Sequence, residues 1–195
     1  LVFIVDTAYA GSMLEKYPTN QKLFAMTSSN SYQTSECKYC PPHNDVVGKV
    51  HIGVCLSDFL TAVWLEEIDG VNSANLPLNQ LFNVIKSASF LVEETCKYGD
   101  SSFEGEPSSN FFGNQHPSSS KEKSADQEAE VNSRVSSTDT KLLYLINRHA
   151  KLMTAETQSE LNDEIRMRKY YDDLFISIKA LHPEIATAPN TDFTC

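Results

Sequence analysis

Leu1-Val-Phe-Ile-Val-Asp-Thr-Ala-Tyr-Ala-Gly-Ser-Met13 begins with five apolar residues and then changes abruptly to an acidic residue, small residues and a Gly-Ser pair. A short apolar run of this kind is typical of a strand that is buried on both faces of a sheet. In open α/β sheets, ligands and catalytic groups lie at the carboxyl ends of such strands. The segment that follows the run is therefore a candidate site, although an ordinary strand-to-loop junction has the same composition.

Strand-like and helix-like segments alternate through the first half of the chain. Lys22–Ser28 predicts a second buried strand. Leu56–Asp69 has apolar residues at helical spacing, and a second stripe follows Pro77, a residue that the first turn of a helix tolerates. Residues 1–100 are therefore predicted to form an α/β domain.

The composition changes in the second half. Residues 101–137 are rich in Ser, Asn, Glu and Lys, which predicts a flexible linker. Residues 138–182 predict two antiparallel helices, the second with Thr154 as its N-cap, and residues 183–195 predict a loose tail. Because Leu1 already lies inside an apparent strand, we expect the chain to be the distal part of a longer protein.

Charge and hydropathy restrict the partners. The formal net charge is −10, and we find no cluster of Lys and Arg of the kind that binds phosphates. No apolar run approaches the length of a membrane span. We therefore expect neither nucleic acid nor a membrane as a partner, and we expect no cofactor.

The chain contains five cysteines: Cys37, Cys40, Cys55, Cys96 and Cys195. Cys37-Lys-Tyr-Cys40 has the spacing of a zinc knuckle, but no second Cys or His pair follows at a suitable spacing, so we expect no metal site. A disulfide closing the loop from Cys40 to Cys55 is the favoured alternative, and it would imply an oxidising or secretory compartment. The spacing permits this bond without establishing it.

Short motifs along the chain resemble, in the same order, those of the legumain family, and in particular its plant-type branch, the vacuolar processing enzymes. The segment before Gly11-Ser12 resembles the family's nucleophile strand, where Glu-Ala-Cys precedes a Gly-Ser pair. The further motifs are Phe24-Ala-Met-Thr-Ser-Ser-Asn30, Thr34-Ser35, Tyr39-Cys-Pro41, Cys55-Leu-Ser-Asp58, Trp64-Leu-Glu-Glu67, Lys97-Tyr-Gly-Asp100 and Leu142-Leu-Tyr-Leu145. Outside the linker, the resemblance extends to about residue 180.

The resemblance implies a fold and an activity. Residues 1–100 would form the C-terminal part of a caspase-like, mostly parallel sheet with flanking helices, and residues 138–182 a helical propeptide segment. The family's enzymes cleave after Asn, sometimes Asp, or ligate peptides, using a cysteine thiolate, a histidine base and backbone N–H groups that hold the oxyanion. The implied partners are a peptide or protein substrate around Asn and the chain's own propeptide helices, in a vacuole or lysosome-like compartment reached through the secretory pathway.

The resemblance also assigns site residues. The family's pocket for the asparagine side chain maps to Asp6, which stands in place of a Glu, and to Thr34, Ser35 and Asp58. From the residues alone, the favoured interpretations are that Asp58 caps a helix and that Ser35 forms a turn. Cys40 and Cys55 match cysteines that pair in plant legumains, which supports the disulfide. Asn110 and Asn114 are candidates for processing in the linker.

Two departures bear on catalysis. Ala8 occupies the position of the family's nucleophile, and a methyl group cannot form a thiolate. The family's histidine base maps upstream of Leu1. The five histidines present, none in the family's His-Gly context, are His43, His51, His116, His149 and His182. We therefore expect an inactive legumain-like endopeptidase; the alternative is a non-catalytic module that binds Asn-containing peptides or active paralogues.

Overall fold

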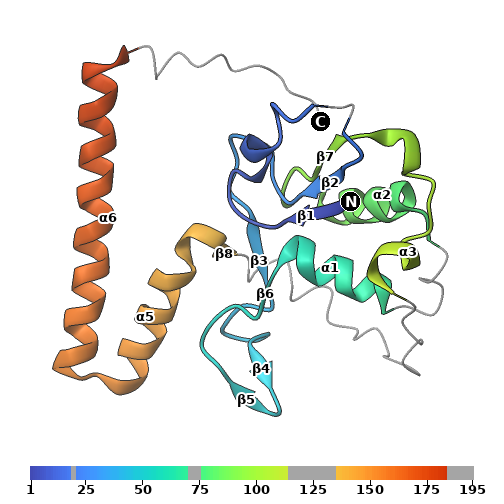
Figure 1. The fold of residues 1–195 in the computed structure, drawn as a ribbon. Coiled ribbons are helices and arrows are strands. Elements are labelled where there is room, and N and C mark those ends of the chain that lie inside the picture. Colours follow the sequence, from blue (N-terminus) through green and yellow to red (C-terminus); the bar gives the residue numbers. More distant parts are fainter. Residues whose placement is uncertain (19–20, 70–75, 114–134, 184–195) are drawn as a thin grey trace. The chain divides into compact units, whose positions relative to one another are not determined.

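A computed structural model describes residues 1–18, 21–69, 76–113 and 135–183 (Figure 1). The chain divides into two compact units, one built from residues 1–138 and one from residues 139–194. Each unit is described by itself. None of the described helices combines the length and the apolar character that crossing a membrane requires.

The first unit is built around β2 (Phe24–Thr27), whose four residues are all buried. β1 (Val2–Val5) pairs with it in parallel, and β7 (Cys96–Gly99) pairs with it antiparallel on the other side. β1 is thus an edge strand of this sheet, and Phe3 is 45% exposed. The prediction that the first apolar run is buried on both faces was wrong, because the face of β1 that carries Phe3 is left partly open to solvent in the described structure. β2 is the buried strand that Lys22–Ser28 predicted.

Two helices cover one face of this sheet. They are α1 (Phe59–Ile68) and α2 (Leu78–Ser89), within the two segments predicted from helical spacing. Their buried side chains pack with Phe24 and Met26, which alternate along β2 and so point to the same face. Ala25 points the other way and packs in a second cluster with Ala10 of the 3-10 helix η1 (Ala10–Met13). The 3-10 helix that follows β1 therefore packs on the face of the sheet opposite α1 and α2.

Two smaller sheets complete the first unit. β3 (Glu36–Lys38) lies between β6 (Ser57–Asp58) and β8 (Val135–Ser136), and both ladders are antiparallel. β4 (Val46–Val47) and β5 (Val50–His51) form an antiparallel hairpin. The α/β class is confirmed. Because β1–β2 is the only parallel ladder within the described ranges, a mostly parallel sheet stays a prediction.

The first part of the predicted linker is folded. It contains the 3-10 helix η3 (Ser101–Phe103) and α3 (Ser109–Phe112). Phe103 and Phe112 pack against the main core, and the ring of Phe112 meets that of Trp64 edge to face at 5.2 Å. Aromatic side chains therefore fix a segment whose polar composition predicted a linker, while residues 114–134 lie outside the described ranges.

The second unit is a pair of antiparallel helices, α5 (Thr140–Leu152) and α6 (Ala155–Leu181), joined by a tight turn at Met153 and Thr154 (Figure 1). The 3-10 helix η4 (Ser137–Asp139) directly precedes α5. Thr154 caps α6 as predicted, and it forms a reciprocal capping box with Thr157. Lys141 of α5 pairs with Glu164 of α6 at 2.6 Å. Leu145 is the one buried residue of α5, so the apolar contact between the two helices is small. The capping box and the ion pair stabilise the helix pair in addition to it.

Gly11 offers a test of this packing. A Cβ at Gly11 would lie 2.5 Å from Tyr98 Oη and 2.8 Å from the backbone of Asn30. We expect Gly11→Ala to lower the free energy of unfolding by about 1–3 kcal/mol. The measurement is urea unfolding followed by the fluorescence of Trp64, the only tryptophan of the chain. Gly105→Ala is the matched control because nothing lies within 4 Å of its Cβ position; equal losses in both variants would contradict the packing described.

Candidate functional site

Ala8 lies in the turn that joins β1 to η1. Two serines that follow β2 hold this turn, because the Thr7 carbonyl accepts hydrogen bonds from Ser28 Oγ at 3.2 Å and from Ser29 Oγ at 3.0 Å. The backbone N–H of Ala10 donates to Ser29 Oγ at 3.1 Å. The turn that carries Ala8, the position that the resemblance assigns to a nucleophile, is therefore held at the carboxyl end of β1, and the methyl group of Ala8 has no atom that can attack a carbonyl.

Asp6 connects β1 to the first turn of α1. Its Oδ2 accepts hydrogen bonds from the Thr61 N–H at 2.9 Å and from Thr61 Oγ1 at 2.5 Å. A carboxylate at this position also complements the helix dipole. Asp6 Oδ1 is buried and has no hydrogen-bond partner in the described structure. Burial raises the pKa of Asp6 above its usual value, and Asp58 raises it further, while Thr61 and Ser28 act in the opposite direction.

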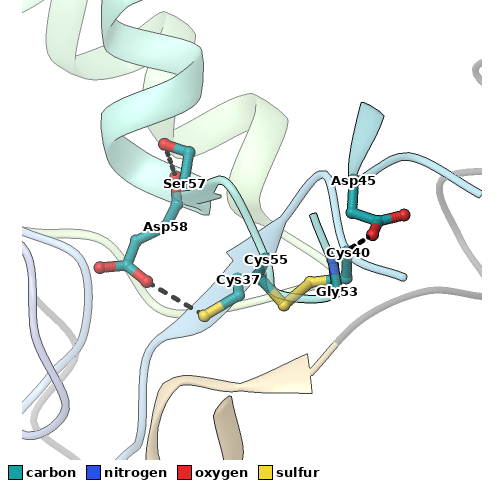
Figure 2. Close-up of a disulfide and its surroundings, with 7 residues drawn as sticks. All are labelled: Cys37, Cys40, Asp45, Gly53, Cys55, Ser57 and Asp58. Carbon is teal, nitrogen blue, oxygen red and sulfur yellow. Dashed lines mark hydrogen bonds between the residues drawn. A yellow bond between two sulfur atoms is a disulfide. The ribbon is translucent and has the colours of Figure 1, made fainter. Parts of the chain in front are cut away.

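Asp58 lies opposite Cys37 in the ladder between β6 and β3. The Cys37 thiol donates a hydrogen bond to Asp58 Oδ1 at 3.0 Å (Figure 2). Asp58 also occupies the N-cap position of α1, although its side chain makes no capping hydrogen bond. Burial, the bond to Asp58 and nearby carboxylates raise the pKa of Cys37 well above its usual value, so the thiol keeps its proton.

Ser35 and Thr34 precede β3. Ser35 is fully buried, and its hydroxyl donates to Ser137 Oγ at 2.9 Å while its carbonyl accepts from the Ser137 N–H at 2.9 Å. Thr34 is half-buried beside it. Val135 pairs with Cys37, so β8 of the same chain occupies one edge of β3. The serine expected to meet a substrate is thus bonded to a residue of its own chain.

Glu93 is a site residue that the sequence analysis missed. It lies just before β7, is 7% exposed, and its Oε2 accepts a hydrogen bond from the backbone N–H of Glu36 at 2.9 Å. Glu93 Oε1 is buried without a partner among the described residues. Burial raises the pKa of Glu93 to about 8, and the negative charges of Asp6, Glu36 and Asp58 act in the same direction. No pattern marks this residue, because Glu93-Glu94 after a helix resembles an ordinary surface pair.

Together, Asp6, Asp58 and Glu93 form what we call the acidic cluster. They come from the end of β1, from β6 and from the segment before β7, and each has one oxygen that accepts a hydrogen bond from the chain itself. Asp6 and Glu93 each keep a second, buried oxygen without a partner in the described ranges. Since buried polar oxygens are normally satisfied, the arrangement is suited to a polar ligand. Within the described residues, no three His, Cys, Asp or Glu side chains are placed to hold a metal ion.

A disulfide joins Cys40 to Cys55 and closes the loop between β3 and β6 (Figure 2). Inside that loop, Asp45 accepts a hydrogen bond from the Gly53 N–H at 2.6 Å and pairs with His51 Nδ1 at 2.7 Å. Closing a loop of this length stabilises a fold by about 3 kcal/mol on the chain-entropy account. The bond lies two residues from the end of β3 and two from the start of β6, so it restrains the register that places Cys37 opposite Asp58.

The remaining predicted positions lie elsewhere. Asn110 is in α3, where its Nδ2 donates to Glu106 Oε2 at 3.0 Å, and Asn114 lies outside the described residues. His149 pairs with Thr157 at 2.9 Å in the helix pair.

Two comparisons with known proteins bear on the site. The family model of the Peptidase C13 family matches residues 1–115, a range that contains Ala8 and the whole acidic cluster. The vacuolar-processing enzyme delta-isozyme of Arabidopsis thaliana is 28% identical over 193 residues. The alignment covers 93% of this chain and 41% of that enzyme, so the chain spans less than half the length of this relative.

The Cys37 thiol should be unreactive in the native protein. We expect a thiol reagent such as Ellman's reagent at pH 8 to label Cys37 more than about 100-fold more slowly in the folded protein than in guanidinium, because the thiol is buried and protonated. Peptide mapping by mass spectrometry identifies the labelled residue. Asp58→Asn, which removes one negative charge and weakens an acceptor, should label faster than the unmodified chain. Native labelling at the denatured rate would contradict the site geometry.

Glu93 should make stability depend on pH. Its pKa is about 8 in the folded state against an ordinary 4.5. The folded state therefore holds this proton more tightly, and the stability it contributes is complete below pH 4.5 and is lost as the pH rises through 8. Glu93→Gln should remove this loss, which amounts to a few kcal/mol in order of magnitude.

The measurement is urea unfolding of both proteins at pH 5 and pH 8.5, followed by Trp64 fluorescence. We expect Glu93→Gln to be the more stable protein at pH 8.5 and to lose that advantage at pH 5. Glu94→Gln is the matched control, since Glu94 accepts a hydrogen bond from Asn30 at 2.9 Å and belongs to no buried cluster. An unchanged pH profile in Glu93→Gln would show that Glu93 is not the titrating group.

Proposed function

The chain belongs to the Peptidase C13 family, the family of the legumains, and on that premise we propose that it is a catalytically inactive member that binds peptides at the acidic cluster. The family supports descent from a legumain-like, asparagine-directed cysteine endopeptidase. The observation that carries the proposal is Ala8 at the end of β1, beside an acidic cluster whose carboxyls keep unpartnered oxygens. By the same premise, α5 and α6 correspond to the helical propeptide segment of the family.

The state of the cysteines supports the loss of catalysis. A cysteine peptidase requires a thiolate beside the scissile carbonyl, and Ala8 supplies none. Cys37 is buried and bonded to Asp58 through its proton, and Cys40 and Cys55 are joined to each other. None of these three sulfur atoms is available to replace the missing nucleophile.

The short pairing of β8 with β3 supports the retention of peptide binding. β8 pairs with β3 through only two residues, so an extended peptide has little to displace when it adds to the same edge. A side chain of that peptide with N–H donors would meet the unpartnered oxygens of Asp6 and Glu93. The amide of asparagine offers such donors, as do cationic side chains.

We place this activity in a vacuole or lysosome-like compartment. The relative from Arabidopsis thaliana is named a vacuolar-processing enzyme. The Cys40–Cys55 disulfide suits an oxidising secretory route. The raised pKa of Glu93 makes the fold more stable at acidic than at alkaline pH, which suits an acidic lumen.

The test is a cleavage assay combined with a binding assay at acidic pH. The protein, as found and as Ala8→Cys, is mixed with a fluorogenic peptide that contains Asn, and binding of a labelled copy is followed by fluorescence anisotropy. We expect the protein as found to bind the peptide without cleaving it, because the thiolate is missing. Cleavage by Ala8→Cys alone would assign the inactivity to residue 8. Cleavage by the protein as found, or absence of binding, would overturn the proposal.

A further inference from the structure

We propose that a second copy of this chain binds an exposed apolar stripe on the C-terminal half of α6, so that the two α6 helices pair antiparallel. The inference goes beyond the proposed peptide binding and does not depend on it. The stripe, which we call the α6 stripe, consists of five apolar residues: Tyr171, Leu174, Phe175, Ile178 and Leu181.

The α6 stripe continues the face of α6 that contacts α5. Along the first half of α6, the residues that pair with α5 follow one another at helical spacing: Thr157, Glu160, Glu164 and Arg168. The same spacing leads on to Tyr171, Phe175 and Ile178. α5 begins beside Arg168, because its N-cap residue Asp139 pairs with Arg168 at 2.6 Å. Residues 169–181 therefore extend past α5, as Figure 1 shows, and no helix of this unit covers their continuation of the face in the described structure.

This continuation is apolar and open to solvent. Phe175 is 61% exposed, and Tyr171 and Leu181 are exposed as well. Apolar side chains that gather on one face of a helix mark an interaction surface. Five side chains of this size present on the order of 400–500 Å² per copy, so that a pair would bury close to 1,000 Å², the lower bound of a specific interface. The area therefore suits a weak, reversible dimer.

Charge favours a second copy as the occupant. Residues 169–181 contain two lysines and two aspartates, so this segment is neutral, whereas the whole chain has a formal net charge of −10. Two copies of a neutral segment do not repel each other when they meet. A strongly acidic or strongly basic partner would gain no net attraction from this part of α6.

Asp172 and Lys179 determine the direction of the pairing. They lie three residues before and four residues after Phe175, so both neighbour it on the helix surface. In an antiparallel pair with Phe175 near the two-fold axis, Asp172 of each copy lies beside Lys179 of the other. A parallel pair in register would instead bring like charges to the same level, which is unfavourable.

The experiment is sedimentation equilibrium of the full chain at pH 7 and 0.15 M salt, over concentrations from 1 to 200 µM. We expect the mass to rise from 21.8 kDa toward twice that value, with a dissociation constant in the micromolar range. Phe175→Glu should raise this constant about tenfold or more, because the pair would bury an unpaired charge. Far-UV circular dichroism verifies that the helices remain folded.

Ile176→Glu is the matched control. Ile176 is 67% exposed, slightly more than Phe175, and the next position along a helix lies about 100° around its axis, off the α6 stripe. The control introduces the same charge into the same turn of α6. We expect its dissociation constant to stay within about threefold of that of the unmodified chain.

A charge exchange tests the antiparallel arrangement. Lys179→Asp places two acidic side chains together at each contact and should weaken the dimer about threefold or more. Adding Asp172→Lys to the same chain restores opposite charges in an antiparallel pair, so the double variant should return to within about twofold of the unmodified chain. Absence of this rescue would overturn the antiparallel pairing.

The remaining outcomes decide the proposal as a whole. A chain that stays monomeric up to 200 µM would overturn it. A dimer that Phe175→Glu leaves intact would also overturn it, because another surface would then hold the two copies. A monomeric chain that still binds the Asn-containing peptide would leave the proposed function standing, so the two failures are distinguishable.

Discussion

The register of β3 against β6 is the constraint on which the site depends. It places Cys37 opposite Asp58 and Lys38 opposite Ser57, and the Cys40–Cys55 disulfide closes the loop just beyond both strands. Each of these strands is very short, so the ladder contributes few hydrogen bonds of its own. The covalent bond and the buried Asp45, which holds the Gly53 N–H inside the loop, restrain a pairing that two residues alone would hold weakly.

Negative charge also lies at the N-terminus of α1. Asp6 binds the Thr61 N–H there, and Asp58 occupies the N-cap position. The helix dipole favours carboxylates at this end, which helps the chain to tolerate acidic side chains so close together. Glu93 has no such helix contact and instead accepts the Glu36 N–H of β3. The pKa of Glu93 is raised chiefly by burial, and the negative charges of Asp6, Glu36 and Asp58 raise it further.

Periodicity and capping predicted much of the fold, because those signals are local. The apolar run of β2, the helical stripes of α1 and α2, and the Thr154 cap of α6 all correspond to patterns readable in the sequence. The exposure of Phe3 on β1 was not predictable, because an apolar run does not reveal which of its faces the rest of the chain will cover. The folding of residues 101–113 depends on Phe103 and Phe112 finding the core, which composition does not show. Motif resemblance indicated Asp6, Ser35 and Asp58, while Glu93 became visible only when tertiary structure buried it.

The titration of Glu93 is the most direct test of the account. Side-chain carboxyl carbon shifts of ¹³C-labelled glutamate, recorded from pH 4 to pH 10, would give its pKa, with the Glu93→Gln spectrum identifying its signal. The account predicts one glutamate that titrates near 8. A Glu93 signal that titrates near the ordinary 4.5 would contradict the burial of Glu93 beside Asp6 and Asp58.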